Sequence, residues 1–261
     1  MTYDCLKFES RNTVLTVTMD HPDSPLNAVD ARLHAELDRL FEQLRRDTDH
    51  RAIVLTGRRG AFSAGGDYRW FPELADPLVR EEVRRAGKRI IWNLLDIEIP
   101  VVAAVGGPAM GLGATLALCC DAVFMAEDTV LGDPHIKVGL VAGDGGTAIW
   151  PALVGPMLAK RFLLTGDSIG AHDARSMGLV SHVVSSDHVV DEAVVFAENL
   201  AAGAPLALRY TKSAINTALK QRFAEAFDVA LAYETVTMGS ADHQEAVAAI
   251  IDKRSPHFEG R

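Results

Sequence analysis

The protein has 261 residues, of which 48% are hydrophobic and 23% are charged. This length suits one hydrophobic core, or a core with a small appendage, and the composition is that of an ordinary globular protein. The 35 acidic residues outnumber the 26 basic ones, which gives a formal net charge of −9. A general nucleic-acid-binding protein carries the opposite excess, so we expect no nucleic-acid partner.

Cysteine content and apolar runs suggest where the protein is found. There are three cysteines, an odd number, and Cys119 and Cys120 are adjacent within an apolar run. We therefore expect buried thiols rather than a disulfide framework or a zinc site. The first ten residues lack the regions of a signal peptide, and no apolar run is long enough to span a membrane. A cytoplasmic protein with no membrane partner is expected.

Strand-like and helix-like patterns alternate along the first half of the chain. Apolar residues at every second position predict a strand at 14–19, and helical spacing predicts a helix from Leu33 to Leu44. Further strands are expected at 51–57, 100–105 and 122–126, and further helices at 79–96 and 114–120. The segment 100–105 is almost entirely apolar, as expected for a strand that is covered on both faces.

After residue 145 the helical pattern dominates. Helices are predicted near 145–153, 156–164, 171–177, 187–201, 205–218, 221–238 and 242–252. No linker rich in Ser, Gly or Pro separates this part from the rest. We therefore predict an α/β protein whose helical C-terminal part packs on the body or on a partner subunit.

The first glycine-rich motif, Ala-Phe-Ser-Ala-Gly-Gly-Asp at 61–67, directly follows the predicted strand at 51–57. Small residues let a ligand approach the backbone closely, and glycine permits turns that other residues cannot make. Ser63 lacks the preceding glycine of a nucleophile elbow, which disfavours a serine nucleophile. The motif is either a structural turn between a strand and a helix or a ligand-binding turn.

A second motif, Gly-Gly-Pro-Ala-Met-Gly-Leu-Gly at 106–113, lies between a predicted strand and a predicted helix. It superficially resembles a dinucleotide-binding loop, but no acidic residue ends a following strand at the expected distance. Its glycines place free N–H groups at a helix N-terminus, where the helix dipole favours developing negative charge. We therefore expect this turn to stabilise an oxyanion.

The third motif, at 133–147, places His135 and Asp144 nine residues apart in one glycine-rich loop. Imidazole is well matched to proton transfer near neutral pH, and a carboxylate can orient it or stabilise its cation. Either His135 and Asp144 are a catalytic pair, or His135 is a structural histidine.

Glu234 is interpreted as a solvated helix residue. The remaining histidines are interpreted as surface residues without metal-site surroundings: His21, His34, His50, His172, His182, His188, His243 and His257.

In this order the motifs resemble the enoyl-CoA hydratase/isomerase, or crotonase, superfamily. The likeness begins with Met-Asp-His-Pro at 19–22 and Leu-Asn-Ala-Val at 26–29, and it includes the first glycine-rich motif. It continues with Gly-Ala-Thr-Leu-Ala-Leu-Cys-Cys-Asp at 113–121 and ends with Asp-Lys-Arg-Ser-Pro-His-Phe at 252–258. It therefore covers nearly the whole chain.

The resemblance implies a crotonase spiral of ββα units over residues 1–200. It implies a helical C-terminal region over 201–261 that assembles the chain into trimers or hexamers. It also implies an oxyanion hole formed by the backbone N–H groups of Gly66 and Leu112. Coenzyme A would be bound as part of the substrate, with no separate cofactor and no metal. The substrate-binding residues implied are Ala64, Asp67, Arg69, Thr115 and Lys253, with Arg69 and Lys253 at the phosphates.

Two departures from the family pattern concern catalysis. Hydratases of this family use two glutamates to position one water, and here those positions hold Thr115 and His135. Threonine can hold a water but does not take a proton at neutral pH. We therefore expect His135 to be the proton-transfer residue or water activator, and Asp144 to be its partner or a second acid.

The loop also resembles the oxocamphor-hydrolase-like β-diketone hydrolases, which cleave a C–C bond with water and need no CoA. The likeness includes Gly-Asp-Gly at 143–145, Trp-Pro at 150–151, and a glutamate that Glu234 matches as a possible additional acid. The leading expectation is an enoyl-CoA hydratase/isomerase-like lyase or isomerase that acts on an acyl-CoA in fatty acid metabolism. The alternatives are a retro-Claisen hydrolase of a β-diketone and an inactive homologue that serves as a binding module.

Overall fold

A mixed α/β fold is seen in the computed structural model, which describes residues 2–58 and 60–261. The main sheet has six strands in the order β1-β2-β3-β4-β6-β9, and apart from the antiparallel pair β1–β2 its neighbouring strands run parallel. Its strands are β1 (Leu6–Arg11), β2 (Val14–Met19), β3 (Ala52–Gly57), β4 (Val101–Val105), β6 (Ala122–Ala126) and β9 (His182–Val184). A smaller sheet contains β5 (Ala109–Met110), β7 (Val130–Gly132) and β8 (Ser168–Gly170).

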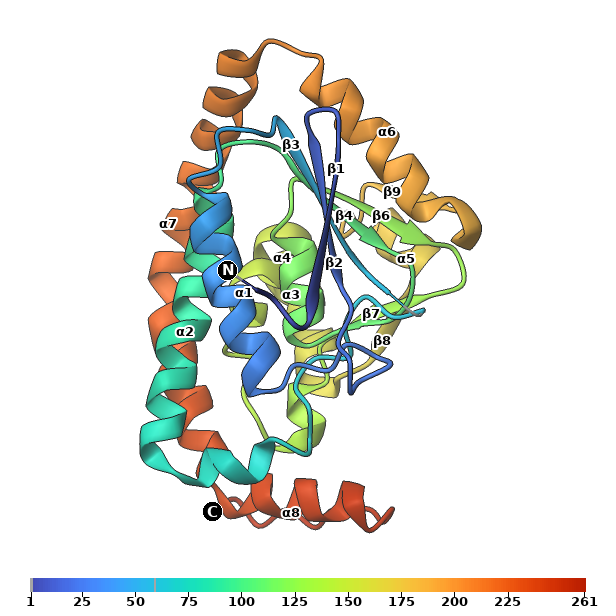
Figure 1. Ribbon diagram of the computed structural model, residues 1–261. Helices are drawn as coiled ribbons and strands as arrows, with labels where there is room; N and C mark the ends of the chain where they lie inside the picture. The colour runs from blue at the N-terminus through green and yellow to red at the C-terminus, as the bar shows by residue number, and fades with distance from the viewer. Residues whose placement is uncertain (1, 59) are drawn as a thin grey trace.

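Helices surround the main sheet, and α1, α2 and α7 stand side by side at one end of it (Figure 1). The α-helices are α1 (Ala31–Leu44), α2 (Pro77–Asp96), α3 (Leu112–Leu118), α4 (Gly146–Thr165), α5 (Ala171–Ser176), α6 (Val189–Ala201), α7 (Pro205–Met238) and α8 (Ala241–Ile251). The short 3-10 helices are η1 (Phe71–Ala75), η2 (His135–Val138) and η3 (Ser186–His188). The predicted α/β class is confirmed.

Strand β4 shows why the main sheet is apolar on both faces. Its residues Val102 and Ala104 pack in a cluster with α6, whereas Val101, Ala103 and Val105 face the larger core on the opposite side. All five side chains are buried. The prediction of a strand that is covered on both faces is therefore confirmed.

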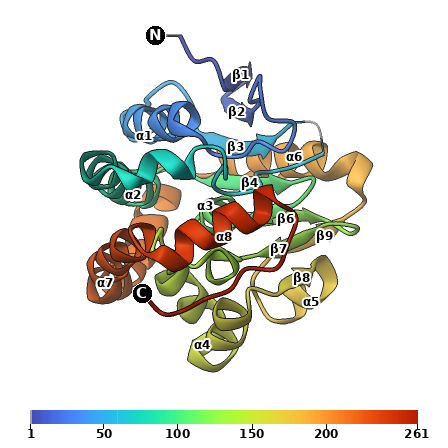
Figure 2. The same cartoon turned by 90° about the horizontal axis from the view of Figure 1, so that it is seen from below.

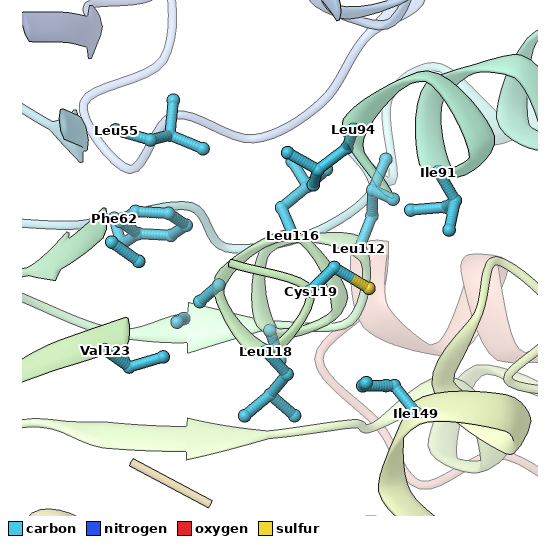
Figure 3. Close-up of a cluster of buried hydrophobic side chains, with 14 of the residues drawn as sticks. Leu55, Phe62, Ile91, Leu94, Leu112, Leu116, Leu118, Cys119, Val123 and Ile149 are labelled. Carbon is cyan, nitrogen blue, oxygen red and sulfur yellow. The ribbon is translucent and has the colours of Figure 1, made fainter. Parts of the chain in front are cut away.

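Helix α3 is buried along its whole length and lies inside the larger core. Figure 3 shows Leu116 of this helix and Cys119, the residue that follows it, between Leu94 of α2 and Ile149 of α4. Packing from several elements fixes the helix in place. The backbone N–H of Leu112, at its first position, is therefore fixed as well.

Two helix predictions differ from the structure. The segments 205–218 and 221–238 form one continuous helix, α7, because the two residues between them, Leu219 and Lys220, are good helix formers and not glycine or proline. The predicted break between 153 and 156 exists as a kink at Gly155 (φ 75°), although the helix resumes at once. The short strands β5, β7, β8 and β9 were not predicted, because two or three residues are too few to show an alternating pattern.

The C-terminal helices pack on the outside of the body. Helix α7 packs against α2 and α4, and α8 runs across the face seen in Figure 2 and contacts η2. The side chain of His243 on α8 bonds the carbonyl of Val138 at 2.7 Å, which fixes α8 on η2. Within the described residues, no helix is long and apolar enough to cross a membrane.

Candidate active site

A cavity of about 210 Å³ lies where the first glycine-rich turn, the start of α3, η2 and α7 meet. Its wall contains His135, Asp144 and Glu234. Apolar side chains form much of the remaining surface: Val29, Trp70, Phe71, Leu74, Val83, Leu112, Val138, Leu140, Leu231, Met238 and Ile250. A mostly apolar cavity with a few converging polar groups is typical of a small-molecule site.

Two residues predicted for an oxyanion hole, Gly66 and Leu112, line this cavity. Val29 forms a parallel bridge beside Gly66, and its hydrogen bonds go to the carbonyl of Gly65 and the N–H of Asp67. The N–H of Gly66 therefore points away from Val29. Leu112 is the first residue of α3, where a backbone N–H has no acceptor within the helix. In the described part of the chain, no hydrogen bond uses either N–H group.

His135, at the start of η2, lies among three carboxyl groups. Its Nδ1 donates a hydrogen bond to Oδ1 of Asp133 at 2.5 Å. Its Nε2 lies 3.4 Å from Oδ2 of Asp144 and 3.8 Å from Oε1 of Glu234. Asp133 follows β7 directly and is fully buried, so the imidazole is held from behind while Nε2 faces the other two acids.

Glycines allow these groups to approach one another. A Cβ atom at Gly143 would lie 2.6 Å from Cβ of Glu234, and one at Gly145 would lie 2.7 Å from Cγ2 of Thr115. Gly145 also has a positive φ of 119°. The Gly-Asp-Gly sequence at 143–145 therefore brings the loop against both α7 and α3, with Asp144 between them.

Burial and mutual charge set the protonation of the cluster. Burial alone would lower the pKa of His135, but the charges of Asp133 and Asp144 raise that pKa well above its usual value. Burial raises the pKa of Asp144 to about 6, against the lowering effect of the charge on His135. Burial, together with the charge of Asp144, raises the pKa of Glu234 to about 8. Near neutral pH, His135 is therefore a cation, Asp144 is mainly ionised and Glu234 is mainly protonated.

Thr115 lies behind the part of the cavity wall that holds Asp144. This residue is fully buried in α3, and its hydroxyl donates a hydrogen bond to Oδ1 of Asp144 at 3.3 Å. It is not among the residues that line the cavity. The hydroxyl of Thr115 therefore contacts Asp144 and does not face the cavity that a substrate would occupy.

The other predicted substrate-binding residues are spread over a wider area. Ala64 lines the cavity. Asp67 is buried and accepts hydrogen bonds from Nε and Nη2 of Arg69, whose side chain is 57% exposed. Lys253 is exposed just beyond α8, three residues after Ile250, which lines the cavity. The structure therefore brings Ala64 to the cavity and leaves both basic residues near the protein surface.

Several interpretations of single residues were wrong or incomplete. Glu234 is buried in the site and is not a solvated helix residue. His21, His34 and His243 are buried, so their interpretation as surface residues is wrong. Asp133 was not singled out, although its position two residues before His135 was a usable signal. Single-residue burial depends on tertiary packing, which the local sequence pattern does not show.

Three side chains also form a group of metal-ligand type. Asp133, His135 and Asp144 each offer one ligand atom, and these atoms lie within 4.8 Å of one another. This grouping was not expected from the sequence. Since Nδ1 of His135 already donates to Asp133, and Glu234 faces Nε2, we interpret the group as a hydrogen-bonded acid–base cluster.

Comparisons with known proteins agree with this architecture. The sequence profile of the enoyl-CoA hydratase/isomerase family matches residues 9–261. A probable enoyl-CoA hydratase of Mycobacterium bovis is 33% identical over 267 residues, which covers 100% of both chains. A solved structure of an enoyl-CoA hydratase/isomerase from Mycobacterium paratuberculosis is 38% identical, with a TM-score of 0.90 over 94% of this chain and 98% of that one.

The similar structures also include an enzyme that is not described as a hydratase. It is a β-diketone hydrolase from the cyanobacterium Anabaena, bound to (S)-3-oxocyclohexyl acetic acid. It is 33% identical, with a TM-score of 0.85, and the match covers 91% of this chain and 95% of that one. The family profile and the full-length relatives together establish the family. The chain belongs to the enoyl-CoA hydratase/isomerase, or crotonase, family.

Proposed function

We propose that this protein is an enzyme that acts on an acyl-CoA thioester by enoyl-CoA hydratase/isomerase-type chemistry, with a different set of acids from the usual glutamate pair. The observation that carries the proposal is the cluster around His135. This cluster shares one cavity wall with two backbone N–H groups that have no other acceptor in the described chain. The two N–H groups can therefore hold a carbonyl oxygen while the side chains of the cluster transfer protons.

The thioester oxygen is proposed to accept hydrogen bonds from the N–H groups of Gly66 and Leu112. Negative charge develops on this oxygen when the substrate becomes an enolate. Fixed donors in a water-poor site stabilise that charge, and one such donor typically contributes about 3 kcal/mol to lowering the barrier.

The acids are proposed to divide the proton transfers between them. Asp144, with a pKa of about 6, is ionised near neutral pH and takes a proton from a water that attacks the β-carbon. Glu234, with a pKa of about 8, is protonated and donates to the α-carbon of the enolate. The two proton transfers and the new C–O bond together add one water. His135 stays a cation and favours the ionised form of Asp144. We therefore propose Asp144 as the base, in place of His135, which the sequence had suggested.

Coenzyme A is proposed to lie across the mouth of the cavity, with its phosphates near Arg69 and Lys253. Guanidinium and ammonium groups suit phosphate oxygens, and exposed charge pairs weaken with salt. No further cofactor is proposed. In the proposed mechanism the residues of the cluster carry out every proton transfer.

Calorimetric titration with acyl-CoA analogues, followed by a crotonyl-CoA hydration assay, tests this function. We expect the affinity to fall with salt, and to fall further in Arg69→Ala and Lys253→Ala. The matched control is Arg46→Ala, because Arg46 is 70% exposed just after the end of α1 and is not a cavity residue. Wild-type protein that binds no CoA thioester would refute the acyl-CoA assignment.

A second candidate is hydrolysis of the C–C bond between two carbonyl groups, as in a retro-Claisen reaction. It is supported by the replacement of both family glutamates and by the similarity to the Anabaena β-diketone hydrolase. Water deprotonated by Asp144 would attack one carbonyl, and the C–C bond would then break to leave a carboxylic acid and an enolate. Glu234 would protonate the enolate carbon. Ring opening of a cyclic β-diketone by the CoA-free protein would favour this candidate, and turnover of either substrate would exclude an inactive binding module.

A further inference from the structure

A buried histidine in the cavity wall has no role in the chemistry proposed above. His34, in the first turn of α1, is 7% exposed and lines the cavity. Its ring lies against that of Trp70, with centroids 5.7 Å apart. In the described part of the chain, no hydrogen bond uses either ring nitrogen of His34. These unpaired nitrogens are not fully enclosed by protein, so the ring faces the cavity, where a ligand group can pair with it.

The space beside His34 is left open by a glycine. Gly87 of α2 also lines the cavity, and a Cβ atom there would lie 4.0 Å from Nε2 of His34 and 3.9 Å from Cδ2 of Leu231. These are ordinary contact distances, so alanine would fit, and alanine is the better residue inside a helix. The absent side chain therefore keeps one side of Nε2 accessible from the cavity.

The surroundings of His34 favour a neutral ligand group. Burial lowers the pKa of His34 to about 4, even though the charge of Asp38 raises it. The ring is therefore uncharged near neutral pH, with one nitrogen that donates and one that accepts. The neighbouring lining residues Trp70, Leu74 and Leu231 are uncharged, and the guanidinium of Arg84, which also lines the cavity, is already paired with the carboxylate of Glu81.

We infer that Nε2 of His34, in the opening left by Gly87, hydrogen-bonds a neutral oxygen on the acyl part of the substrate. The enzyme would then select acyl groups that carry a hydroxyl or keto oxygen away from the carbonyl held by Gly66 and Leu112. This inference rests on the proposed acyl-CoA function, because it concerns the same cavity. His34 would determine specificity and would take no part in the proton transfers.

Matched thioesters test the inference. The affinity of hexanoyl-CoA is compared with that of hexanoyl-CoA thioesters bearing a keto group at the fourth or fifth carbon, or a hydroxyl at the sixth. One hydrogen bond to an otherwise unpaired buried group should favour at least one oxygenated thioester by about tenfold. In His34→Phe this preference should fall to near one, while hexanoyl-CoA still binds. His34→Gln keeps a polar group at a similar reach and should retain part of the preference.

Gly87→Ala provides a second variant that is not expected to disturb folding. Its methyl group should fill the opening and lower the affinity for the preferred thioester more than that for hexanoyl-CoA. The control is Glu42→Gln, an exposed change on α1 that should leave the preference unchanged. If hexanoyl-CoA binds but no oxygenated thioester is preferred, the subsite is refuted and the proposed function stands. If no CoA thioester binds, both are refuted.

Discussion

The hydroxyl of Thr115 donates a hydrogen bond to the carboxylate of Asp144 across 3.3 Å. Thr115 occupies the position where the family pattern places its first catalytic glutamate, and Asp144 comes from the loop that follows η2. Thr115 therefore supports the acid of the loop through its hydroxyl. In the function proposed above, Asp144 and Glu234 take the part of the family's glutamate pair, beside the N–H groups of Gly66 and Leu112.

Removing the imidazole should disable the cluster. His135→Ala removes the cation that lowers the pKa of Asp144, so this pKa should rise, and we expect kcat near pH 7 to fall by roughly 2- to 100-fold because less Asp144 is ionised. His172→Ala is the matched control, because His172 is exposed on α5 and should leave kcat unchanged. Near-normal turnover by His135→Ala would overthrow the catalytic assignment.

Asp133 should influence the reaction through its charge, which shifts the pKa values of the neighbouring side chains. Its carboxylate raises the pKa values of His135, Asp144 and Glu234. Asp133→Asn keeps the shape but removes the charge, so kcat should fall and both limbs of the pH–rate profile should move to lower pH. A purely structural role would lower the rate without moving the profile. Thermal melting of the variant checks that its fold is intact.

Thr115→Val tests the contact between α3 and the loop. Valine has nearly the same shape as threonine but cannot donate the hydrogen bond that lowers the pKa of Asp144. The pKa of Asp144 should therefore rise, and the acid limb of the kcat/KM profile should move to higher pH. The loss of rate near neutral pH should be smaller than in His135→Ala. An acid limb that does not move would show that this hydrogen bond has no influence on the base.

The oligomeric state remains a prediction from the apolar faces of the helical part. Met157 of α4 and Val236 of α7 are 80% and 72% exposed, and Tyr210 and Tyr233 of α7 are also exposed. Exposed apolar side chains along two helices are typical of a subunit interface. We expect sedimentation to give a trimer or a hexamer at micromolar concentration. A monomer under these conditions would contradict this expectation.

The sequence predicted the parts of the fold and site that depend on local patterns. The strands at 14–19 and 100–105 have clear apolar patterns, and each glycine-rich motif marks a turn that reaches the cavity. His135 and Asp144 lie in one such loop, so their proximity followed from spacing.

Residues that enter the site by long-range packing were not predictable in the same way. Glu234 lies 90 residues beyond Asp144 on a helix with a mixed surface, and only the approach of α7 to the loop at 143–145 buries it. His34 is buried because α1 packs on α2, and its first-turn position alone resembles that of a surface residue.

The most direct test of the central claim is the pH dependence of kcat/KM in the wild type and in Glu234→Gln. The base must be ionised and the acid protonated, so the wild type should show a bell with limbs set by Asp144, pKa about 6, and Glu234, pKa about 8. Glu234→Gln should be slower and should lose the alkaline limb, whereas Glu225→Gln, an exposed change on the same helix, should keep the wild-type profile. An alkaline limb that persists unchanged in Glu234→Gln would contradict the assignment of Glu234 as the acid.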